Sequence, residues 1–456
     1  MATMPPPQLY PPLVSFVLAT YNRGPVLVDC LRQVQSCGLA PCDFEIIVVD
    51  NASTDSTPEL LTRELPEVQL IRLSRNEGPV AKNYAIARAC GQFVVFLDDD
   101  AFPLPGAMPR MLEHFTAKPL LGAAAFNVML PDGTQECSAY PDVCIGAGTG
   151  FRKEVLDRVG PLPAEFFMQA EEYDLSFRIL RAGYQVRRFE DLPLRHLKTP
   201  QARIGQRTTR LDVRNNLYLL ARYIPAPLCY QLAADWLSRY WMMAVDRDRL
   251  GGGTPGGGHR KAFMQGAAEG LAKWSARRQG CVPGDDTSFS GGASAPHAQR
   301  GPCPTGHGTR VGPPGTRVRP PGLLESGVIE QIFKFQEIES KLAAARQRLG
   351  FSRILLADFG KNMLAYYLAA KKSGLIISAV VDDRLAVPPP PLPQANDQPR
   401  LYQRDYRSLP ILPWSQARQL PFDAVIISNL SPVHARWQRV ELQGICAVPV
   451  IDLFAP

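Results

Sequence analysis

Short apolar runs alternate with amphipathic stretches over the first 200 residues. Four runs rich in apolar, β-branched and aromatic residues are each bounded by turn residues: Val14–Ala19, Phe44–Val49, Val68–Leu73 and Phe93–Leu97. Such runs are typical of strands covered on both faces. The stretches between them are predicted helices that open with or near a proline: Pro25–Cys37, Thr57–Glu64 and Pro79–Cys90. The alternation predicts an α/β fold with a mostly parallel sheet.

Farther along, Arg152–Val159 and Glu172–Ala182 are predicted helices. The periodic pattern is then lost in residues 251–322, where only Arg260–Arg278 has a helical pattern. The rest of this segment cannot bury enough apolar surface to offset backbone entropy, which predicts a largely disordered Gly/Pro-rich linker. Out-of-frame translation of GC-rich DNA is an alternative origin for residues 279–322, and the sequence leaves both open.

A second, smaller α/β unit is predicted after the linker. A helical stretch, Glu325–Leu349, precedes four strand candidates, which are Arg353–Ala357, Leu375–Val381, Ala424–Ser428 and Val448–Leu453. The chain therefore divides into a first domain at 1–250, the linker at 251–322 and a last domain at 323–456. The last domain resembles the Rossmann-like domains found beside sugar-modifying enzymes. Asp358 and Met363 stand where the dinucleotide fingerprint has glycines, which favours a degenerate binding or docking module over a working NAD site.

Charge is concentrated in the linker. The chain has 456 residues and a net charge of +7. Residues 251–322 contain nine Lys/Arg and three Asp/Glu, so +6 of this charge lies in the linker. A basic segment either binds to an anionic membrane surface or is simply solvated, and both interpretations stay open. We expect no nucleic-acid partner.

Neither a signal peptide nor a membrane span is predicted. The first residues lack a basic region followed by an apolar one. The most apolar stretch, Leu217–Val245, is interrupted by charges but rich in aromatics, so it is either an interfacial helix or a helix packed on its own domain. The ten cysteines form no CxxC pair and are expected to be reduced thiols. We expect a cytoplasmic protein, with peripheral contact at the inner face of the membrane as an open alternative.

Polar clusters follow each of the four predicted strands. These clusters are Thr20–Arg23, Asp50–Asp55, Arg75–Asn83 and Asp98–Asp100. Because ligands of open parallel sheets bind at the carboxyl ends of strands, four such clusters in succession predict one ligand crevice.

The three aspartates after the fourth strand point to a cation. Adjacent carboxylates repel one another unless something positive lies among them, and carboxylate oxygens suit Mg²⁺ or Mn²⁺. A solvated acidic loop is the alternative. The spacing excludes an EF-hand. A haloacid-dehalogenase-like phosphatase would place its aspartate pair after the first strand.

Seven motifs in order give the chain a specific resemblance. They are SFVLATYNR, EIIVVDNASTD, RNEGPVAKNYAIARACG, FVVFLDDDA, GAGTGFRKEVLDRVG, EEYDLSFRILRAGY and a histidine after FEDLPL. Residues 13–224 thereby resemble a family 2 glycosyltransferase with the GT-A fold, rhamnosyltransferase-like in type. The resemblance covers a little under half of the chain.

The resemblance implies roles for the residues of the crevice. The nucleotide-sugar group comprises Thr20, Asn22, Arg23, Asp50, Lys82, Asp98 and Asp99. Asp50 would read the base, and Lys82 would lie near the base or the diphosphate. Asp98 and Asp100 are the ends of the DxD signature and, with His196, would hold the metal. Turn formation and capping remain open for Thr20 and Asn22, and a structural role remains open for His196.

The catalytic base is expected in the motif EEYD. The family usually has Glu-Asp here, and the second position, the base, is Glu172 in this chain. Either carboxylate can accept a proton, and Asp174 is the reserve candidate. Carboxylates are also stabilised at any helix start, so at least one of these residues is expected to be structural. The glycine run Gly146–Gly150 is expected to let the backbone approach the sugar or acceptor.

These features together predict an inverting, metal-dependent glycosyltransferase with Mn²⁺ or Mg²⁺ as cofactor. The expected donor is a UDP- or dTDP-sugar. The expected acceptor is a saccharide or a lipid-linked molecule used for polysaccharide, glycolipid or other glycoconjugate synthesis. Two alternatives stay open: a non-catalytic sugar-nucleotide sensor or scaffold, and a sugar nucleotidyltransferase. The latter would normally carry a longer Gly-rich basic loop than TYNRG after the first strand.

Overall fold

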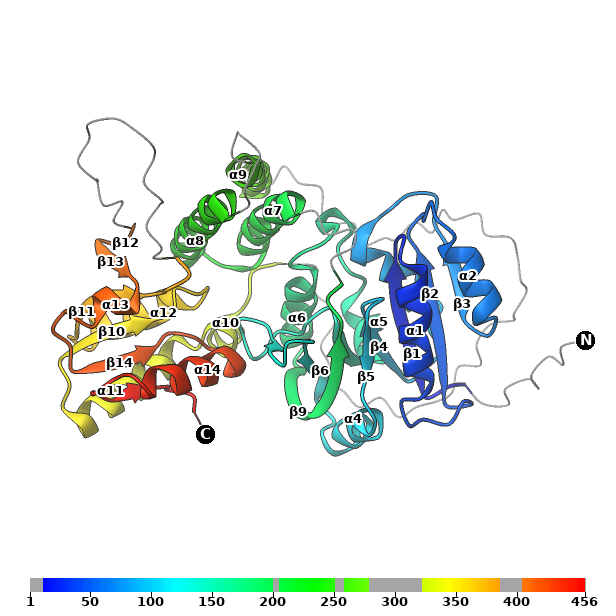
Figure 1. Ribbon diagram of the computed structural model, residues 1–456, viewed down its shortest axis with the longest axis horizontal. Coiled ribbons are helices and arrows are strands. Elements are labelled where there is room, and N and C mark those ends of the chain that lie inside the picture. The colour runs from blue at the N-terminus through cyan, green and yellow to red at the C-terminus, as the bar shows by residue number, and fades with distance from the viewer. Residues whose placement is uncertain (1–10, 200–204, 251–257, 279–321, 386–403, 456) are drawn as a thin grey trace, which may run out of the picture. The chain divides into compact units, whose positions relative to one another are not determined.

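The computed structural model describes residues 11–199, 205–250, 258–278, 322–385 and 404–455 (Figure 1). The chain forms two compact units. Of the described residues, the first unit comprises 11–138, 142–199 and 322, and the second comprises 139–141, 205–250, 258–278, 323–385 and 404–455.

The elements of the first unit are β1 (Val14–Thr20), α1 (Gly24–Gln35), β2 (Phe44–Asp50), α2 (Thr57–Glu64), β3 (Gln69–Arg72), the 3-10 helix η1 (Gly78–Ala81), α3 (Lys82–Ile86), β4 (Phe93–Leu97), β5 (Ala101–Pro103), α4 (Ala107–Ala117), β6 (Leu121–Met129), β7 (Gln135–Glu136), β8 (Gly148–Arg152), α5 (Lys153–Val159), the 3-10 helix η2 (Ala164–Phe166), α6 (Glu171–Arg181) and β9 (Gln185–His196). The elements of the second unit are α7 (Gly205–Tyr223), α8 (Leu228–Leu250), α9 (Gly258–Arg278), α10 (Ser326–Phe333), α11 (Phe335–Leu349), β10 (Arg353–Ala357), α12 (Met363–Lys372), β11 (Ile376–Val381), β12 (Arg404–Tyr406), β13 (Leu409–Leu412), α13 (Trp414–Ala417), β14 (Ala424–Ile427), α14 (Pro432–Gln443) and β15 (Val450–Ile451).

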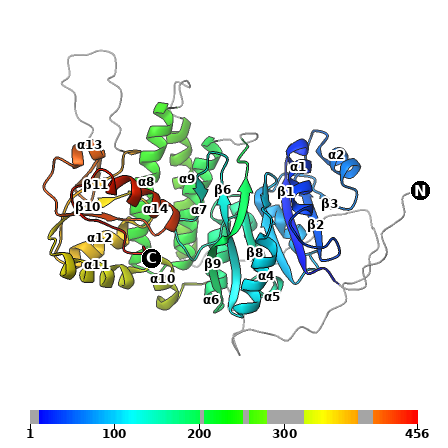
Figure 2. The same ribbon diagram turned by 60° about the horizontal axis from the view of Figure 1, so that its bottom comes forward.

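The first unit is built on a mixed sheet with the strand order β3-β2-β1-β4-β8-β6-β9-β5. Strands β3, β2, β1 and β4 run parallel, with Thr20 opposite Asp50 in the register of β1 and β2. Alternate residues of β1 and β4 pack with α1 and α4 in one core, and α1 lies alongside β1 and β2 in both views (Figures 1 and 2). The α/β prediction is confirmed, and the polar ends of β1, β2 and β4 lie at one edge of the sheet.

Most of the second half of this sheet was not predicted from the sequence. Strand β6 has the alanine-rich sequence LGAAAFNVM, which carries little of the β-branched character that marks a strand. It becomes a strand because it pairs with β8 on one side and β9 on the other. Strand β9 ends at His196, and its neighbour β5 follows the aspartate triplet directly.

The second unit contains a smaller, mostly parallel sheet with the strand order β12-β13-β11-β10-β14-β15. Only β12 runs antiparallel to its neighbour among the described strands of this sheet. The second α/β sheet is therefore confirmed. The predicted helix Glu325–Leu349 is instead two helices, because Lys334 between α10 and α11 adopts a left-handed conformation with φ of 55°.

The units divide at a different residue from the predicted boundary after 250. Helix α8 belongs to the second unit, where Arg239 and Trp236 donate hydrogen bonds to the carbonyls of Phe359 and Lys361 in the loop after β10. Helix α7 packs closely on α9, so it follows the same unit. The predicted helix Arg260–Arg278 is present as α9. The remainder of the predicted linker, 251–257 and 279–321, lies outside the described residues.

No helix in the described ranges is long and apolar enough to cross a bilayer. The aromatic-rich stretch Leu217–Val245 belongs to α7 and α8. Four of its aromatic side chains are buried in the second unit, and these are Tyr218, Tyr223, Trp236 and Tyr240. This favours packing of the stretch on its own unit, although Tyr230 and Trp241 are 53% and 40% exposed.

The α7–α9 contact gives a stability prediction. A Cβ added at Gly266 of α9 would lie 2.3 Å from the carbonyl oxygen of Arg210 in α7. Because backbone must shift to accommodate it, we expect Gly266→Ala to destabilise the second unit by about 1–3 kcal/mol. Urea unfolding followed by tryptophan fluorescence measures this unit, since all five tryptophans lie in it.

The matched control is Gly327→Ala in α10, where a new Cβ meets nothing within 4 Å. We expect this variant to be unchanged or stabilised by about 0.4–1 kcal/mol. Equal stability of the two variants would contradict the close approach of α7 and α9.

The loop after β10 decides whether the second unit can hold a dinucleotide. Asp358 has φ of +83° and is 4% exposed. Its carboxylate accepts hydrogen bonds from Arg384 (2.5 Å) and from Asn429. Arg384 also donates to Asp382, which ends the next strand. A pyrophosphate needs a glycine-lined, electropositive loop at this place, and a buried carboxylate stands there instead.

We therefore expect the full chain to bind neither NAD nor NADP with micromolar affinity at this loop. Isothermal titration of the full chain with each dinucleotide measures this. A micromolar Kd that Asp382→Asn abolishes would contradict the prediction, because it would place the ligand at the end of β11. The Rossmann-like character of the unit stays a prediction.

Candidate active site

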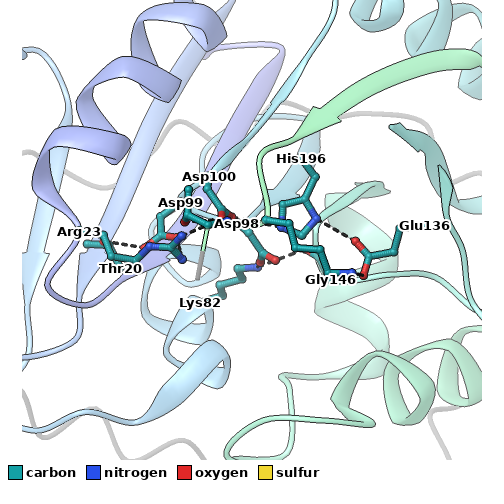
Figure 3. A network of polar contacts seen from close by, with 11 residues as sticks. Thr20, Arg23, Lys82, Asp98, Asp99, Asp100, Glu136, Gly146 and His196 are labelled. Atoms are coloured by element: carbon teal, nitrogen blue, oxygen red, sulfur yellow. Dashed lines mark hydrogen bonds and ion pairs between the residues drawn. The ribbon is translucent and has the colours of Figure 1, made fainter. Parts of the chain in front are cut away.

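The aspartate triplet lies at the carboxyl end of β4, where the chain turns into β5. Strand β4 has the sequence FVVFL and is buried throughout, so the first polar side chains after it are forced to the sheet edge. Asp98 keeps 37% of its side chain exposed, while Asp99 and Asp100 are buried. Figure 3 shows the triplet among side chains from β1, α3 and β9.

Arg23 neutralises two of the three carboxylates. Its Nη1 donates to Asp99 at 2.7 Å and its Nη2 donates to Asp100 at 2.6 Å (Figure 3). Thr20 donates its hydroxyl to the other oxygen of Asp99 at 2.8 Å. Burial raises the pKa of Asp99 to about 6, against the opposing effects of Arg23 and Thr20. Thr20 and Arg23, predicted at the nucleotide, thus lie among the aspartates.

Lys82 links Asp98, the partly exposed aspartate, to the glycine run. Its buried ammonium donates to Asp98 at 3.1 Å and to the carbonyl of Gly146 at 3.3 Å (Figure 3). A cation fixed beside Asp98 also suits the anionic part of a nucleotide. The structure therefore places Lys82 and Asp98 together.

His196 reaches the triplet from the end of β9. Its Nε2 lies 3.2 Å from Oδ1 of Asp100, and one ligand atom each from Asp98, Asp100 and His196 lie within 4.8 Å of one another. Residues 98 and 196 are far apart in sequence, and the pairing of β5 with β9 brings them together. The predicted metal ligands therefore form one cluster.

The chemistry of this cluster fits a divalent cation. Two carboxylates and an imidazole are a donor set for Mn²⁺ or Mg²⁺, and the buried Nε2 of His196 has no hydrogen-bond partner of good geometry among the described residues. Burial opposes the ionisation of Asp100, but His196 and Arg23 hold the pKa of Asp100 below its usual range. Burial lowers the pKa of His196, yet its carboxylate neighbours raise that pKa to about 9. A proton and a metal ion would compete for Nε2.

Sequence reasoning missed Glu136. This residue lies on β7, and its Oε2 is 2.8 Å from Nδ1 of His196 (Figure 3). Burial opposes ionisation, but His196 and Lys198 lower the pKa of Glu136 to about 2. No motif marks Glu136 in TQECSAY, although the turn signal PDG before it predicts a hairpin that could have placed it near β6.

Asn22 and Asp50 have hydrogen-bond partners within the protein. Asn22 has φ of 56° and accepts a hydrogen bond from the backbone N–H of Thr54 at 2.8 Å, which joins the loop after β1 to the loop after β2. Asp50 is fully buried at the end of β2 and accepts from the N–H of Ser53 at 3.2 Å. Arg72 lies 3.8 Å from its second oxygen. Their predicted nucleotide contacts stay predictions.

The three carboxylates of the acidic motif lie on helix α6 in different environments. Asp174 is 1% exposed and accepts from Arg178 at 2.8 Å, so it is committed to an ion pair. Glu171 is buried, and burial followed by the charge of Glu172 raises its pKa well above the usual range. Glu172 is only partly buried. Three residues before α6, which are Phe167, Gln169 and Ala170, have positive φ, a type of backbone strain that clusters at functional sites.

Two glycines of GAGTG have a packing role that the sequence did not predict, and the expected approach of sugar or acceptor to this backbone stays a prediction. A Cβ at Gly148 would lie 2.6 Å from Leu194, and one at Gly150 would lie 2.3 Å from Met111. These two glycines therefore allow β8 to pack against its own core. Gly146 has open space where its Cβ would be, and its carbonyl binds Lys82.

Comparisons with known proteins agree with this geometry. Residues 15–140 match the family described as Glycosyl transferase family 2. The chain is 37% identical over 108 residues to the succinoglycan biosynthesis protein ExoO of Rhizobium meliloti, a match that covers 23% of this chain and 30% of that protein. It is 37% identical over 103 residues to the uncharacterized glycosyltransferase YwdF of Bacillus subtilis, covering 22% of this chain and 37% of that one.

Among solved structures, a mannosyltransferase from Pyrobaculum calidifontis in complex with GDP-Man and Mn²⁺ shares 20% identity with a TM-score of 0.41, covering 59% of this chain and 89% of that one. A likeness this low does not bear on function. The chain matches about a third of the length of the first two relatives, so their activities are not transferred to it. The N-terminal part of the chain is a family 2 glycosyltransferase domain with the GT-A fold. The matched segment contains the aspartate triplet and ends before Glu172 and His196.

Proposed function

We propose that this protein is a metal-dependent, inverting glycosyltransferase that moves a sugar from a nucleoside diphosphate to an acceptor hydroxyl. The observation that carries the proposal is the cluster of Asp98, Asp100 and His196 at the end of β4 within a family 2 domain. A sensor or scaffold would need neither a donor set for a cation nor a general base such as the partly exposed Glu172.

The residues of the cluster would hold the donor. Asp98, Asp100 and His196 would bind a divalent cation, which when bound neutralises the charge of the diphosphate leaving group. Lys82, fixed between Asp98 and Gly146, would add positive charge beside the diphosphate. Arg23 holds Asp99 and Asp100 in place, so that their negative charge is not left unpaired before the cation binds.

Glu172 would accept the proton of the acceptor hydroxyl. The acceptor oxygen then forms a bond to the anomeric carbon from the face opposite the nucleotide, and the bond to the diphosphate oxygen breaks with its electrons leaving on the diphosphate. This displacement inverts the anomeric carbon. Glu172 suits the role better than its neighbours, because Glu171 favours its protonated form and Asp174 is paired with Arg178.

The proposed substrates follow the family resemblance. The donor would be a UDP- or dTDP-sugar, and the acceptor a saccharide or lipid-linked molecule in polysaccharide or other glycoconjugate synthesis. We place the reaction in the cytoplasm. Peripheral contact with the inner face of the membrane is part of this proposal, supported by the excess of basic residues in 251–322.

A panel of nucleotide sugars tests the proposal. Each would be tested with the full chain for slow hydrolysis and for protection against thermal unfolding, with Mn²⁺ and with EDTA. We expect one donor class to raise the Tm only when Mn²⁺ is present. Protection by several nucleotide sugars without any hydrolysis or transfer would instead favour the sensor function, and release of pyrophosphate would favour a nucleotidyltransferase.

A further inference from the structure

The segment after β9 encloses Asp100. The backbone N–H of Leu197 donates to the carbonyl of Asp100 at 2.8 Å. The N–H and the hydroxyl of Thr199 both donate to Oδ2 of Asp100 at 2.8 Å, and Nε2 of His196 faces Oδ1 at 3.2 Å. Residues 196–199, together with Arg23, therefore orient the Asp100 carboxylate.

Glu136 contacts this segment through both of its carboxylate oxygens. One oxygen, Oε2, lies 2.8 Å from Nδ1 of His196, and the other, Oε1, accepts from the ammonium of Lys198 at 3.2 Å. Glu136 is fixed in turn by β7, which pairs with β6 so that Glu136 lies opposite Val128. Because β6 also pairs with β9, the carboxylate and the end of β9 belong to one rigid sheet. Figure 3 shows the His196 ring between Asp100 and Glu136.

The contact with Glu136 also selects the form of the imidazole. An ionised carboxylate only accepts hydrogen bonds, so Nδ1 of His196 must be the donor. In the neutral ring the lone pair is then on Nε2, the atom that faces Asp98 and Asp100. A carboxylate behind a metal-binding histidine fixes both the tautomer and the ring orientation.

We propose that Glu136 is a positioning residue, which holds the His196 ring and the 196–199 segment so that Nε2 and the Asp100 carboxylate converge on one divalent cation. This rests on the metal site of the proposed function and deepens it. The third ligand and its support then come from β9 and β7, outside the strand that carries the aspartates.

Titration of the full chain with Mn²⁺ alone tests this, with no donor or acceptor present. We expect Glu136→Ala to weaken Mn²⁺ binding by about 10–100-fold, the usual effect of removing such a partner. Glu136→Gln keeps an acceptor oxygen for Nδ1 and should lose less. Gln135→Ala, on the same short strand, is the matched control and should bind as the unaltered chain does.

A double variant distinguishes a positioning role of Glu136 from a general disturbance of the fold. If Glu136 acts through His196, Glu136→Ala should cause no further loss of Mn²⁺ affinity in a His196→Ala chain. ¹⁵N spectra of the imidazoles, recorded above pH 9 where the ring is neutral, should also show Nδ1 of His196 protonated in the unaltered chain and in Glu136→Gln.

Three results with the Glu136 variants would overturn the inference. The first is Mn²⁺ affinity within twofold of the unaltered chain for a folded Glu136→Ala. The second is an equal loss with and without His196. The third result is needed only if Glu136→Ala does not fold. It is a Mn²⁺ affinity of Glu136→Gln equal to that of the unaltered chain, together with an unprotonated Nδ1 of His196 in that variant. An unaltered chain that binds no Mn²⁺ removes the metal site and this inference together. If the unaltered chain binds Mn²⁺ and the Glu136 variants weaken that binding as expected, but the chain transfers no sugar, only the proposed function is overturned.

Discussion

We expect Glu172→Gln to slow sugar transfer by about 10²–10⁴-fold while donor affinity stays within a few-fold of the unaltered chain. Glutamine keeps the size and hydrogen-bonding capacity of the side chain but cannot take up the acceptor's proton, and loss of a general base has an effect of this size. Initial rates of transfer give the first quantity, and calorimetric titration with the donor gives the second.

The neighbouring carboxylates provide matched controls on the same helix. Because burial favours the protonated form of Glu171, Glu171→Gln should resemble the native side chain and leave the rate nearly unchanged. Asp174→Asn breaks a buried ion pair with Arg178, so it should lower the Tm. The rate of sugar transfer by the protein that remains folded should change little. A slow Glu171→Gln beside a nearly normal Glu172→Gln would move the base to Glu171. If all three variants transfer sugar normally, the proton is removed by a group outside this motif.

We expect Asp100→Ala to abolish Mn²⁺-dependent donor binding. Asp100 contributes a carboxylate to the cluster, and it is also the residue around which Arg23 and the 196–199 segment are organised. Loss of a ligand should exceed the ~10–100-fold loss that follows removal of an outer-shell partner. Calorimetric titration of a nucleoside diphosphate with Mn²⁺ and with EDTA measures the dependence.

Asp99→Asn is the control for this experiment. Asp99 is the adjacent carboxylate, but it binds Thr20 and Arg23 and is not part of the cluster with His196. We expect this variant to keep the difference between Mn²⁺ and EDTA, even where the affinity itself falls. Donor affinity that is unchanged in Asp100→Ala would remove Asp100 from the metal site.

Elements whose residues are buried on both faces were predictable from the sequence. Strands β1 and β4 and helix α2 lie where the apolar pattern placed them, because burial of every side chain, or of one helix face, leaves a local signature. Positive charge beside the aspartate triplet was also predictable, because adjacent carboxylates repel one another. The sequence predicted a divalent cation there, and it did not predict that Arg23 pairs with Asp99 and Asp100.

Elements that depend on distant partners were not predictable. The stretch Pro79–Cys90 has a helical pattern, yet it is divided between η1 and α3. Gly78 at its start has φ of 71° and lies against Phe167, whose carbonyl oxygen would be only 2.5 Å from an added Cβ. Asn83 is bound to both backbone groups of Leu162. Such contacts join residues about 80 to 90 positions apart, so no local period records them.

The sequence by itself determined the α/β class, the two sheets, the order of motifs in the GT-A domain and the acidic cluster at one sheet edge. It did so because each depends on a local apolar period or on adjacent residues. Only the tertiary structure decided that α7 and α8 belong with the second sheet, that Asp174 is an ion-pair partner, and that Glu136 stands behind His196. These depend on which surfaces meet after folding. For Glu136 the cause is the register of β7 on β6 and of β6 on β9, which brings residues 60 positions apart to 2.8 Å.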